Sequence, residues 1–252
     1  MPTAIVTGAS RGLGFALTRA LLRDGHRIVV DARGARELDA AARELSDLGD
    51  LVALRGNVTD AEHRCALVEA AGERIDVLVN NASVLGPSPQ PALADYPLHV
   101  LELVYRVNVV APLALAQLVL PRMPAGGRIL NVTSDAAAEP YPGWGGYGSS
   151  KAALEQLTAI LAAEQPGLRV YAVDPGDMRT RMQQDAFPGE DISDRPPPEA
   201  SVPGLLALID GELPSGRYRA AEIAAAKSAA AALATPGAKS AAAAPETAGA
   251  GV

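Results

Sequence analysis

A single α/β domain with a doubly wound parallel sheet is the fold that this 252-residue sequence predicts, and two observations carry the prediction. Short runs of Ile, Val and Leu that stop at Gly, Asn or Asp alternate with segments whose apolar residues recur at helical spacing. Strict alternation of strand and helix favours a parallel sheet covered on both faces. The length and the 48% of hydrophobic residues suffice for one large core, so we expect one domain over residues 1–220.

The individual elements follow from local signals. Strands are expected where apolar runs are bounded by turn residues, at about 3–7, 27–31, 51–55, 75–80, 127–133 and 168–173. The intervening segments, such as "LGFALTRALLRDG" and "ARELDAAARELSDLG", have apolar residues at helical spacing and end at Gly. Ligands of this kind of fold bind beyond the carboxyl ends of the strands, so motifs directly after strands are candidate sites.

One segment breaks this alternation before the end of the chain. From Gly176 to about Ser201 the sequence is polar, Pro-rich and poorly periodic. Such a stretch after a strand favours a long loop over the ligand site, and we expect a substrate-binding lid over about residues 176–212. A solvated connection without a role in binding is the alternative.

The C-terminal residues 221–252 form a segment of low complexity, with 16 Ala among its 32 residues and with Pro and Gly as helix breakers. Alanine favours helix, but an isolated helix of this length is only marginally stable in water. We expect a frayed helix followed by a flexible tail that takes no part in the chemistry.

Composition argues against several partners. The chain has a net charge of −7 and no block of Lys or Arg, so it lacks the basic surface that nucleic-acid binding requires. The single cysteine, Cys65, has no partner for an internal disulfide, and its helix-like surroundings predict a buried, inert thiol. This suits the reducing cytoplasm, which is the location that we expect.

No segment of the sequence predicts a membrane contact. The N-terminus, "MPTAIVTGAS", leads directly into a strand pattern without the basic and apolar regions of a secretion signal. The longest apolar stretch, Val109 to Pro121, is too short to span a bilayer and includes Gln117. We expect this stretch to be a buried helix.

Directly after the first expected strand comes the glycine-rich stretch "TGASRGLG", residues 7–14. Gly8, Gly12 and Gly14 leave the backbone free of Cβ atoms, so that a pyrophosphate can approach the exposed N–H groups of a helix N-terminus. Three glycines alone are a weak signal, because their spacing differs from G-x-G-x-x-G. Their position between a strand and an amphipathic helix is the context that dinucleotide binding requires.

Here the chain resembles the short-chain dehydrogenases and reductases, whose nucleotide motif is T-G-x-x-x-G-x-G. A second motif of that family, N-N-A-G, looks like "NNAS" and differs at Ser83, and the family's adenine-contacting Asp-Val stands as Asn57-Val58. The resemblance runs from about Ile5 to Thr180 and implies a Rossmann-like oxidoreductase that binds NAD(P). It places the cofactor against Gly8, Ser10, Arg11, Gly12, Leu13, Gly14, Asn57, Val58, Asn80, Asn81 and Ala82.

The end of the second expected strand, "RIVVDARG", distinguishes NADP from NAD. A carboxylate there hydrogen-bonds the ribose 2′-hydroxyl, whereas an arginine accommodates a 2′-phosphate. On the family pattern Ala32 takes the position of the acid and Arg33 that of the arginine, while Asp31 falls one residue early and points to the other face. Arg11 adds a second positive charge. We expect NADP(H); NAD(H) is the alternative if Arg33 is a simple surface arginine.

A tyrosine and a lysine four residues apart, Tyr147 and Lys151, lie in the expected helix "GYGSSKAALEQLTAILAAE". Residues i and i+4 share one helix face, so the ammonium group has a fixed place beneath the phenol. Tyrosine, with an ordinary pKa near ~10, is a poor base at neutral pH unless a positive charge stabilises its phenolate. Such a pair alone arises often by chance, and an exposed tyrosine packed over a lysine stem is the alternative.

Further motifs, in the order of the family, support a catalytic role for this pair. "RILNVTS" delivers Ser134 to the end of the fifth expected strand, thirteen residues before Tyr147, where the family has its catalytic serine. Asn108 in "YRVNVVAP" resembles the fourth member of the family's catalytic tetrad.

The stretch "VDPGDMRT" follows the sixth expected strand. The resemblance implies that Pro175 and Gly176 lie along the nicotinamide and that Thr180 binds its carboxamide. Asp174 stands where the family usually has Asn.

These residues predict hydride transfer. The protein must place a carbonyl against the cofactor and protonate the developing alkoxide. We expect Tyr147 to act as general acid, Ser134 to orient the substrate oxygen, and Lys151 to lower the phenol pKa and hold the ribose. Asn108 is expected to kink its helix and position a water that relays protons to Lys151; an ordinary polar helix residue is the alternative.

The substrate side carries weaker signals. Tyr141, Trp144 and Met182 are candidates to line a substrate pocket, and aromatic packing is the alternative. Arg179 and Arg181 either bind an anionic substrate group or are solvated charges. His26, His63 and His99 are widely spaced, so we expect surface or helix-end histidines and no catalytic metal.

Together these observations predict an NADP(H)-dependent oxidoreductase that interconverts a small-molecule carbonyl and a secondary alcohol. The rival is a non-catalytic NADP(H)-binding sensor or scaffold of the same fold, which has no need to hold Ser134, Tyr147 and Lys151 together. An enzyme acting on pteridines or other ring systems is a third possibility. The resemblance also implies a homodimer or homotetramer through helices near 97–122 and 145–164, whose apolar faces are otherwise core.

Overall fold

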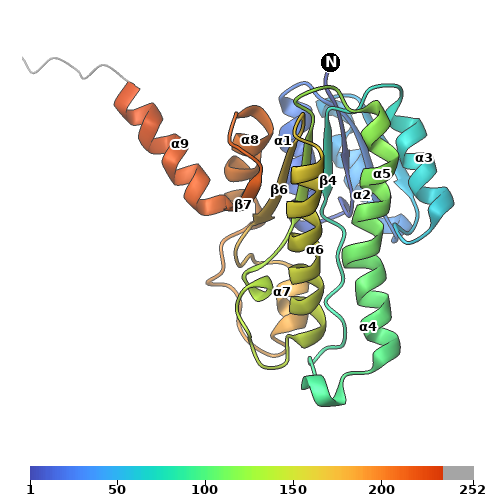
Figure 1. The fold of residues 1–252 in the computed structure, drawn as a ribbon, viewed down its shortest axis with the longest axis vertical. Helices are drawn as coiled ribbons and strands as arrows, with labels where there is room; N and C mark the ends of the chain where they lie inside the picture. The colour runs from blue at the N-terminus through green and yellow to red at the C-terminus, as the bar shows by residue number, and fades with distance from the viewer. Residues whose placement is uncertain (235–252) are drawn as a thin grey trace, which may run out of the picture.

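The computed structural model describes residues 1–234 and shows a seven-stranded sheet with helices on both faces (Figure 1). The strand order is β3-β2-β1-β4-β5-β6-β7, and neighbouring strands pair in parallel. The order reverses between β1 and β4, because the chain returns from the edge strand β3 to the other side of β1. The carboxyl ends of β1 and β4 therefore flank the crevice in which folds of this class bind ligands. The predicted doubly wound, Rossmann-like fold is confirmed.

The elements alternate along the chain as follows. The strands span Thr3–Val6 (β1), Arg27–Ala32 (β2), Leu51–Arg55 (β3), Val77–Asn80 (β4), Arg128–Val132 (β5), Arg169–Asp174 (β6) and Gly216–Arg219 (β7). The helices span Gly12–Arg23 (α1), Ala35–Leu45 (α2), Ala61–Ala71 (α3), Leu98–Tyr105 (α4), Ala111–Val119 (α5), Gly145–Glu164 (α6), Arg181–Ala186 (α7), Val202–Asp210 (α8) and Ala220–Ala234 (α9). A π-helix, Arg106–Val110, joins α4 to α5.

The six strands expected from the sequence all occur, with bounds within two residues of the expected ones. β7 has no such signal, because "GRYR" contains no apolar run. Its residues alternate between half-buried and exposed at the edge of the sheet. Pairing with β6 holds this strand in place, rather than its own hydrophobicity.

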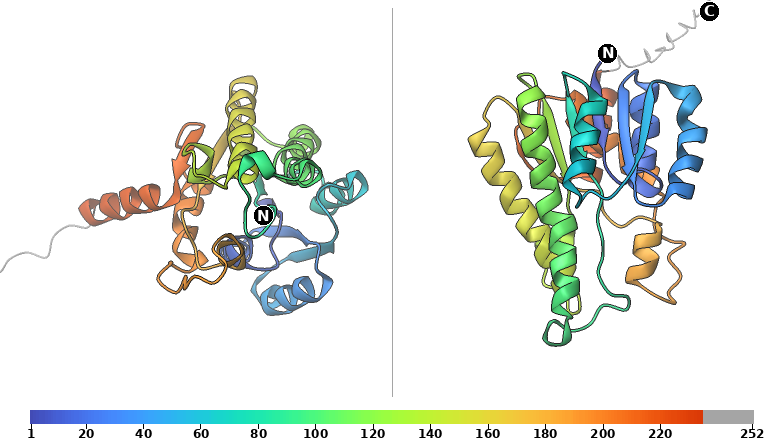
Figure 2. Two further views of the ribbon diagram at one scale, coloured as in Figure 1. Left: turned by 90° about the horizontal axis from the view of Figure 1, so that it is seen from below. Right: turned by 90° about the vertical axis from the view of Figure 1, so that its right-hand side faces the viewer.

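Helices cover both faces of the sheet (Figure 2), and two apolar cores fill the space between the strands and these helices. On one face α1, α2 and α8 bury residues such as Leu17 and Leu208, which are inaccessible to solvent. On the other face α3 and α5 bury Leu67 and Leu115, and α6 packs at the edge of that core. Each fully buried leucine contributes about 1.5–3 kcal/mol to folding. These cores fix the sheet, so the loops at its carboxyl edge are left to form a site.

The segment over that edge is shorter than the lid expected over about 176–212. α7 and its flanking loops border the site, but α8 packs against α1 with Val202, Leu205 and Leu208 buried in the core. The part of the segment that borders the site ends near Pro198. The lid prediction therefore included a core helix.

α9 follows β7 directly and points away from the body of the molecule (Figure 1). Ala220 and Ile223 are buried against the core, whereas residues 225–229 are exposed. The helix predicted for the Ala-rich segment is thus present through Ala234. The flexible tail expected after it lies outside the described residues.

One continuous helical stretch, Leu98–Arg122, is long and apolar enough to cross a bilayer, with a mean hydropathy of 1.7. It exceeds the apolar run Val109 to Pro121 because α4, the π-helix and α5 join end to end. Half of its most apolar window is buried inside the fold, as in core helices of soluble proteins. The absence of a membrane contact stays a prediction.

The surface of α3 corrects one expectation. Cys65 is exposed, so the predicted buried thiol is wrong. α3 turns Leu67 and Val68 towards the core, and Cys65 lies on the opposite side of the helix.

Candidate active site

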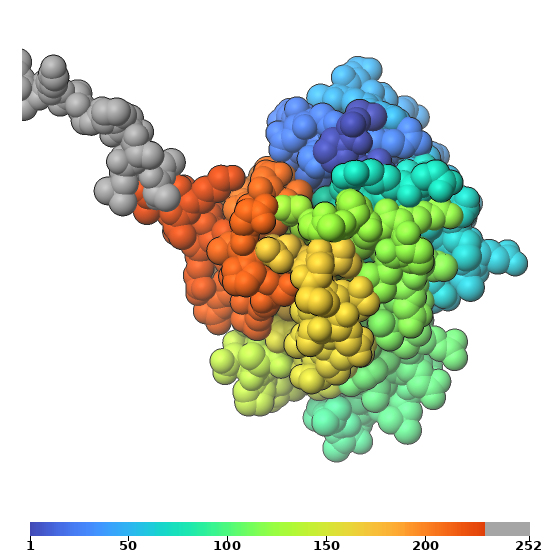
Figure 3. Space-filling view, turned by 45° about the horizontal axis from the view of Figure 1, so that its top comes forward, coloured from blue at the N-terminus to red at the C-terminus, as the bar shows by residue number. Residues whose placement is uncertain are grey.

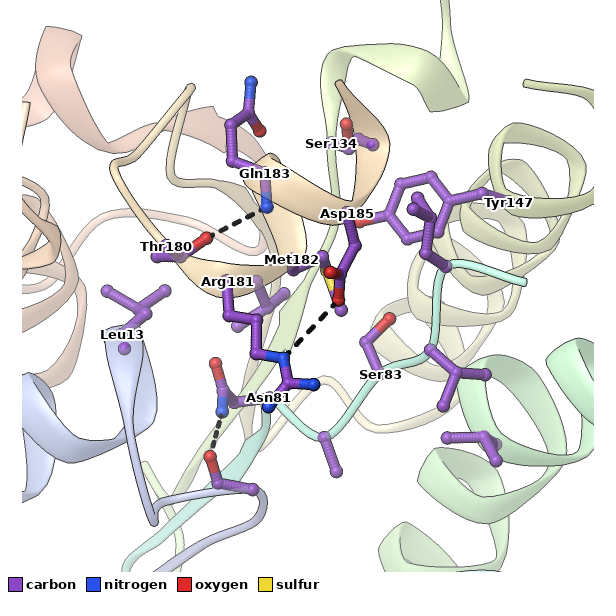
Figure 4. A pocket seen from close by; sticks show the side chains of 18 of the residues that line it. Leu13, Asn81, Ser83, Ser134, Tyr147, Thr180, Arg181, Met182, Gln183 and Asp185 are labelled. Carbon is purple, nitrogen blue, oxygen red and sulfur yellow. Dashed lines mark hydrogen bonds and ion pairs between the residues drawn. The ribbon is translucent and has the colours of Figure 1, made fainter. Parts of the chain in front are cut away.

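A cleft of about 1290 Å³ opens at the carboxyl edge of the sheet, between the glycine loop after β1 and helix α7 (Figure 4). Its volume exceeds the roughly 300–1,000 Å³ of a typical small-molecule pocket, so it has room for a dinucleotide and a second ligand. It is bordered by the loops after β1, β2, β3, β4, β5 and β6, together with residues of α4 and α7.

The glycine loop lies directly against the "NNAS" segment. A Cβ atom on Gly8, whose φ is +68°, would lie 2.9 Å from Cα of Ala82, and one on Gly14 would lie 2.5 Å from Nδ2 of Asn81. Asn81 also donates from Nδ2 to the backbone oxygen of Thr7 at 2.8 Å. Gly14 serves this close packing and does not border the cleft. The N-terminus of α1 has no side-chain cap, which leaves N–H groups for an anion.

A buried aspartate–histidine contact supports the glycine loop from below. Asp31 accepts a hydrogen bond from the N–H of Gly8 at 2.8 Å and pairs with Nε2 of His63 at 2.9 Å. Asp31 is 1% exposed and His63 is 8% exposed. His63 lies in the first turn of α3 and is thus one of the helix-end histidines that we expected, although its side chain is buried, as is that of His26. Each carboxylate oxygen of Asp31 thus has one partner inside the protein, and Asp31 also borders the cleft.

Asn80 departs from its predicted role in cofactor binding. Its Nδ2 donates to Oδ1 of Asn131 at 2.8 Å, and Asn131 donates to Oγ1 of Thr158 at 2.8 Å. Asn80 is 4% exposed and does not border the cleft. It ties β4 to β5 and α6, so it supports the site only from inside the fold.

The end of the cleft beside the loops after β2 and β3 carries charges of both signs. Arg11 and Arg33 are exposed and border it, as does Asn57, whose Oδ1 accepts from the N–H of Thr59 at 3.1 Å. Glu37, in the first turn of α2, borders it as well. Sequence reasoning missed Glu37, although its position four residues after Arg33 places it at the same helix N-terminus.

Tyr147 and Lys151 occupy successive turns of α6 and face the cleft together. Tyr147 is 8% exposed and Lys151 is 2% exposed. The Nζ atom of Lys151 lies 5.5 Å from the centre of the phenol ring and donates to the backbone oxygen of Val132 at 2.8 Å. The exposed-tyrosine alternative is therefore wrong: both side chains are buried at the end of β5.

Burial shifts both groups of this pair away from their charged forms. It raises the pKa of Tyr147 far above its ordinary value, and the carboxylate of Asp174 adds to the rise. Hydrogen bonding with Ser83 and Ser134 opposes it. Burial lowers the pKa of Lys151 to about 7. Lys151 therefore gains or loses its proton near neutral pH, which suits a group that passes protons.

Ser134 ends the strand β5 in extended conformation and caps a short helical turn. Its Oγ accepts from the N–H of Ala136 at 3.2 Å and donates to Oδ1 of Asp135 at 2.9 Å. Figure 4 shows the hydroxyl of Tyr147 between Ser134 and Ser83.

Asn108 lies at the centre of the π-helix and is completely buried. Its Oδ1 accepts from the N–H of Val84 at 2.9 Å, and its Nδ2 donates to the carbonyl of Val84 at 2.9 Å and to Oγ of Ser150 at 3.0 Å. The helix is thus locally widened to a π-turn at Asn108, where we expected a kink, and π-helical turns of this kind cluster at functional sites. Because the amide is fully bonded, a relay water would have to bind to the backbone.

The departure at Ser83 places an extra hydroxyl in the site. Oγ of Ser83 donates to Oδ1 of Asn108 at 3.1 Å, and Ser83 lies on the side of the cleft that faces the hydroxyl of Tyr147 (Figure 4). Sequence reasoning recorded Ser83 only as a mismatch. The sequence feature that could have indicated a role for Ser83 is the replacement of Gly by a polar side chain shortly after β4.

Asp174 is held by two arginines that sequence reasoning missed. Its Oδ1 accepts from the N–H of Gly176 at 2.9 Å, which fixes the Pro175–Gly176 turn beside the cleft. Its Oδ2 lies 3.6 Å from Nη2 of Arg217 and 3.9 Å from Nε of Arg219, both on β7. Both arginines lie on β7, the strand that the sequence analysis did not predict, so their charges beside Asp174 were not expected.

The far end of the cleft is aromatic and apolar. Trp144 packs edge-on against Tyr141 and Tyr147, with ring centroids 6.4 and 5.9 Å apart, and lies 5.8 Å from Phe187. Met182 packs against the same group. Trp144 and Met182 therefore belong to one packed group and also border the cleft. Phe187 belongs to the same group, although the sequence analysis did not predict it.

Arg179, just before α7, and Arg181, at the start of α7, both contact other residues of the protein. Arg179 donates to the carbonyl of Ser193 at 3.3 Å, and Nε of Arg181 lies 3.9 Å from Oδ2 of Asp185. Thr180 lies over the glycine loop, with its Cγ2 3.6 Å from a Cβ built on Gly12, and its Oγ1 caps α7 by accepting from Gln183.

The structure brings most of the predicted site residues to one cleft. Those that border it are Gly8, Ser10, Arg11, Gly12, Leu13, Arg33, Asn57, Val58, Asn81, Ala82, Ser134, Tyr147, Lys151, Pro175, Gly176 and Thr180. Within residues 1–234, no cluster of three His, Cys, Asp or Glu side chains is arranged to hold a metal ion.

Comparison with known proteins identifies the family. Residues 2–191 match the family model described as short chain dehydrogenase. The chain is 33% identical over 235 residues to the rhamnolipids biosynthesis 3-oxoacyl-[acyl-carrier-protein] reductase of Pseudomonas aeruginosa, covering 88% of this chain and 86% of that protein. It is 35% identical over 182 residues to short-chain dehydrogenase/reductase SDRA of Arabidopsis thaliana, covering 70% and 71%.

A solved structure agrees with these relatives. A short chain dehydrogenase from Shigella flexneri, complexed with NADP, superposes with a TM-score of 0.79 at 27% identity, covering 87% of this chain and 96% of that one. The chain therefore belongs to the short chain dehydrogenase family and is an oxidoreductase.

Proposed function

We propose that the chain is an NADP(H)-dependent enzyme that interconverts a carbonyl compound and a secondary alcohol, with Tyr147 as general acid and base. The observation that carries this proposal is the grouping of Ser134, Tyr147 and Lys151 at one end of a cleft whose other end is the glycine loop. The NADP bound by the Shigella flexneri relative supports the choice of cofactor.

The cleft fits a dinucleotide on its own geometry. Gly8 and Gly12 have φ values of +68° and +60°, and the uncapped N-terminus of α1 suits a pyrophosphate. Arg11 and Arg33 suit a 2′-phosphate, and the Pro175–Gly176 turn suits the nicotinamide. When bound, the nicotinamide supplies or accepts the hydride.

The residues of the chain provide the proton and the orientation. In reduction, the hydroxyl of Tyr147 donates its proton to the substrate oxygen as negative charge develops there. Ser134 donates a hydrogen bond to the same oxygen and orients it. Lys151, with a pKa of about 7, returns a proton towards the phenol near neutral pH and contacts the ribose. The backbone at Asn108 holds a water that supplies Lys151.

The experiment that tests this proposal combines binding and turnover. Purified protein is titrated with NADPH and NADH by cofactor fluorescence, and NADPH oxidation is then followed with a panel of ketones, aldehydes and quinones. Tight NADPH binding with turnover is the expected result. Binding without turnover of any carbonyl favours the sensor or scaffold, and failure to bind either nucleotide contradicts the proposal.

Cofactor preference is expected to depend on Arg33. Arg33→Ala removes a charge-assisted bond to the 2′-phosphate, so kcat/KM for NADPH should fall about 10–100-fold while that for NADH changes less than threefold. Glu37→Gln is the matched control, because loss of a negative charge at the same end should raise kcat/KM for NADPH. Steady-state kinetics with both cofactors measure this, and an equal loss for NADPH and NADH in Arg33→Ala contradicts the assignment.

We also propose a homodimer or homotetramer in the cytoplasm. Large apolar side chains are exposed on α4, the π-helix and α6, among them Leu98, Leu103, Val110 and Ile160. The space-filling view shows that α4 and α6 form one continuous face (Figure 3). Burying this face against a second copy would remove these side chains from water.

A further inference from the structure

The aromatic residues of the chain are concentrated at one end of the cleft. The sequence contains one Trp, two Phe and six Tyr. The Trp, one Phe and two of the Tyr form a connected group there, with ring centroids 5.8–6.4 Å apart: Tyr141, Trp144, Tyr147 and Phe187. They come from the loop before α6, from α6 itself and from the end of α7. In so aromatic-poor a chain, this grouping beside the phenol of Tyr147 points to a ligand.

The surroundings of this group are apolar. Leu85, Met182 and Ala186 pack against it. Val100, Leu103 and Val104 of α4 border the same cleft. A ring next to Tyr147 would therefore be enclosed by apolar and aromatic side chains, which favour edge-on contacts with a further ring.

The charges at this end do not favour an anion. Asp135, Asp177 and Asp185 border the cleft, and Asp135 accepts from the hydroxyl of Tyr141 at 3.1 Å. Asp177 lies 3.6 Å from Arg195 and Asp185 lies 3.9 Å from Arg181, whereas Arg179 donates to the carbonyl of Ser193. Three aspartates thus stand against three arginines, so this end has no excess of positive charge to hold a phosphate or carboxylate on the substrate.

We propose that the substrate is an uncharged ketone that carries an aromatic ring, bound with the ring against Trp144 and Phe187. This rests on the proposed function for the reaction itself. The ring contacts give the selectivity, and an anionic acyl thioester finds no excess of positive charge at this end.

The test compares matched probes. 1-Phenyl-1,2-propanedione should be reduced with kcat/KM at least tenfold above 2,3-hexanedione, and acetoacetyl-coenzyme A should be the poorest of the three. Phe187→Ala should lower the aryl-to-alkyl ratio at least fivefold. Phe15→Ala, which changes the other Phe on α1 away from the cleft, should leave the ratio unchanged. Equal rates for the two diketones, or a preference for acetoacetyl-coenzyme A, overturn the proposal and leave the proposed function intact.

Trp144 provides a readout that needs no turnover. As the only Trp, it reports occupancy of this end of the cleft through its fluorescence in the presence of NADP⁺. Saturable quenching by the aryl diketone and none by 2,3-hexanedione supports the aromatic subsite even if no carbonyl is reduced. Absence of saturable quenching by the aryl compound overturns it.

A separate observation concerns Ser83, the residue that differs from the family motif. Its Oγ donates to Asn108 at 3.1 Å, and Ser83 faces the hydroxyl of Tyr147 (Figure 4), so it stands between the π-helix and the reacting hydroxyl. Oδ1 of Asn108 has a second donor, the N–H of Val84 at 2.9 Å. The hydroxyl of Ser83 is therefore free to turn from Asn108 to a phenolate without leaving Asn108 unsatisfied.

We infer that Ser83 is a positioning residue that donates to the phenolate of Tyr147 in the alcohol-oxidation direction. Like the substrate class, this rests on the proposed function. Ser83→Ala should move the rise of kcat for oxidation upward by about one pH unit, because a hydrogen bond to the charged form is lost. Ser83→Gly, which restores the family residue, should shift it similarly. Ser149→Ala, which removes an exposed hydroxyl of α6 bonded to Gly146, should not. An unchanged kcat profile in Ser83→Ala overturns the inference.

Discussion

Tyr147→Phe is expected to lower kcat by about 10²–10⁴-fold while NADPH binding changes less than threefold. The substitution removes only the hydroxyl that delivers the proton, and general acid catalysis supplies a factor of this size. The ring stays packed against Trp144 at 5.9 Å and over Lys151 at 5.5 Å, so the fold and the cofactor end of the cleft are retained. Ser83 and Ser134 keep their other partners, Asn108 and Asp135.

The measurement is NADPH oxidation at saturating carbonyl, with fluorescence titration of NADPH alongside. Tyr96→Phe is the matched control: Tyr96 is 5% exposed, and its hydroxyl has no hydrogen-bond partner in the described part of the chain. This control should keep its kcat. If Tyr147→Phe retained more than a tenth of the wild-type kcat, Tyr147 would not be the proton donor, and a different group would have to be sought among Ser83, Ser134 and Lys151.

Most of the fold could be predicted because the strands of a parallel sheet with two covered faces are runs of apolar residues that are easily seen in the sequence. Strands such as β1 and β6 are nearly continuous apolar runs, since both of their faces are buried. β7 is an edge strand held by pairing with β6, so its own residues carry no such mark. The lid expected over about 176–212 includes α8 because this helix follows a Pro-rich loop, although its leucines pack in the core against α1.

The candidate site could be located because its residues follow strands. Side-chain partners across the fold could not be read in the same way. The motif includes Asn80 and Asn81 side by side, but Asn80 turns inward because Asn131 on β5 offers an acceptor. Asp31 and His63 are 32 residues apart, and only the pairing of β2 with its neighbours brings α3 beneath the glycine loop. Ser83 is a mismatch to the family motif, and its role can be recognised only in the structure, where it faces the phenol of Tyr147.

Lys151 is unusual in this chain, and its burial has a consequence for stability. It is the only lysine before residue 227, whereas arginine supplies the other positive charges of that region. Arginine cannot lose its proton in a protein, but lysine can. Burial lowers the pKa of Lys151 to about 7 from an ordinary 10.5. The use of lysine at this one position fits a group that must release a proton near neutral pH.

The sign of the stability effect follows from that shift. Below about pH 7 the folded protein holds a charged, buried Lys151, and the full cost of burying the charge is present. Between pH 7 and 10.5 the unfolded chain binds a proton that the folded chain does not, so this cost declines as the pH rises. Above 10.5 both states are neutral and the cost is gone. The difference of about 3.5 units corresponds to roughly 4–5 kcal/mol.

Lys151→Met is therefore expected to stabilise the cofactor-free protein at pH 6 by about 3 kcal/mol, once roughly 1 kcal/mol is subtracted for the lost bond to Val132. This corresponds to a rise in Tm of about 6–12 °C at pH 6. The gain should shrink as the pH rises and reverse to a small loss by pH 10.5, because the bond to Val132 is still missing there while the charge no longer has a cost. The same variant should lose most of its turnover. Lys227→Met, at an exposed lysine of α9, is the control and should change neither quantity. Thermal unfolding across pH 6–10.5 tests this prediction. A gain in Tm that persists at pH 10.5, or no gain in Tm at pH 6, would mean that burying the charge of Lys151 does not destabilise the fold. Its position beneath Tyr147 would then serve packing alone.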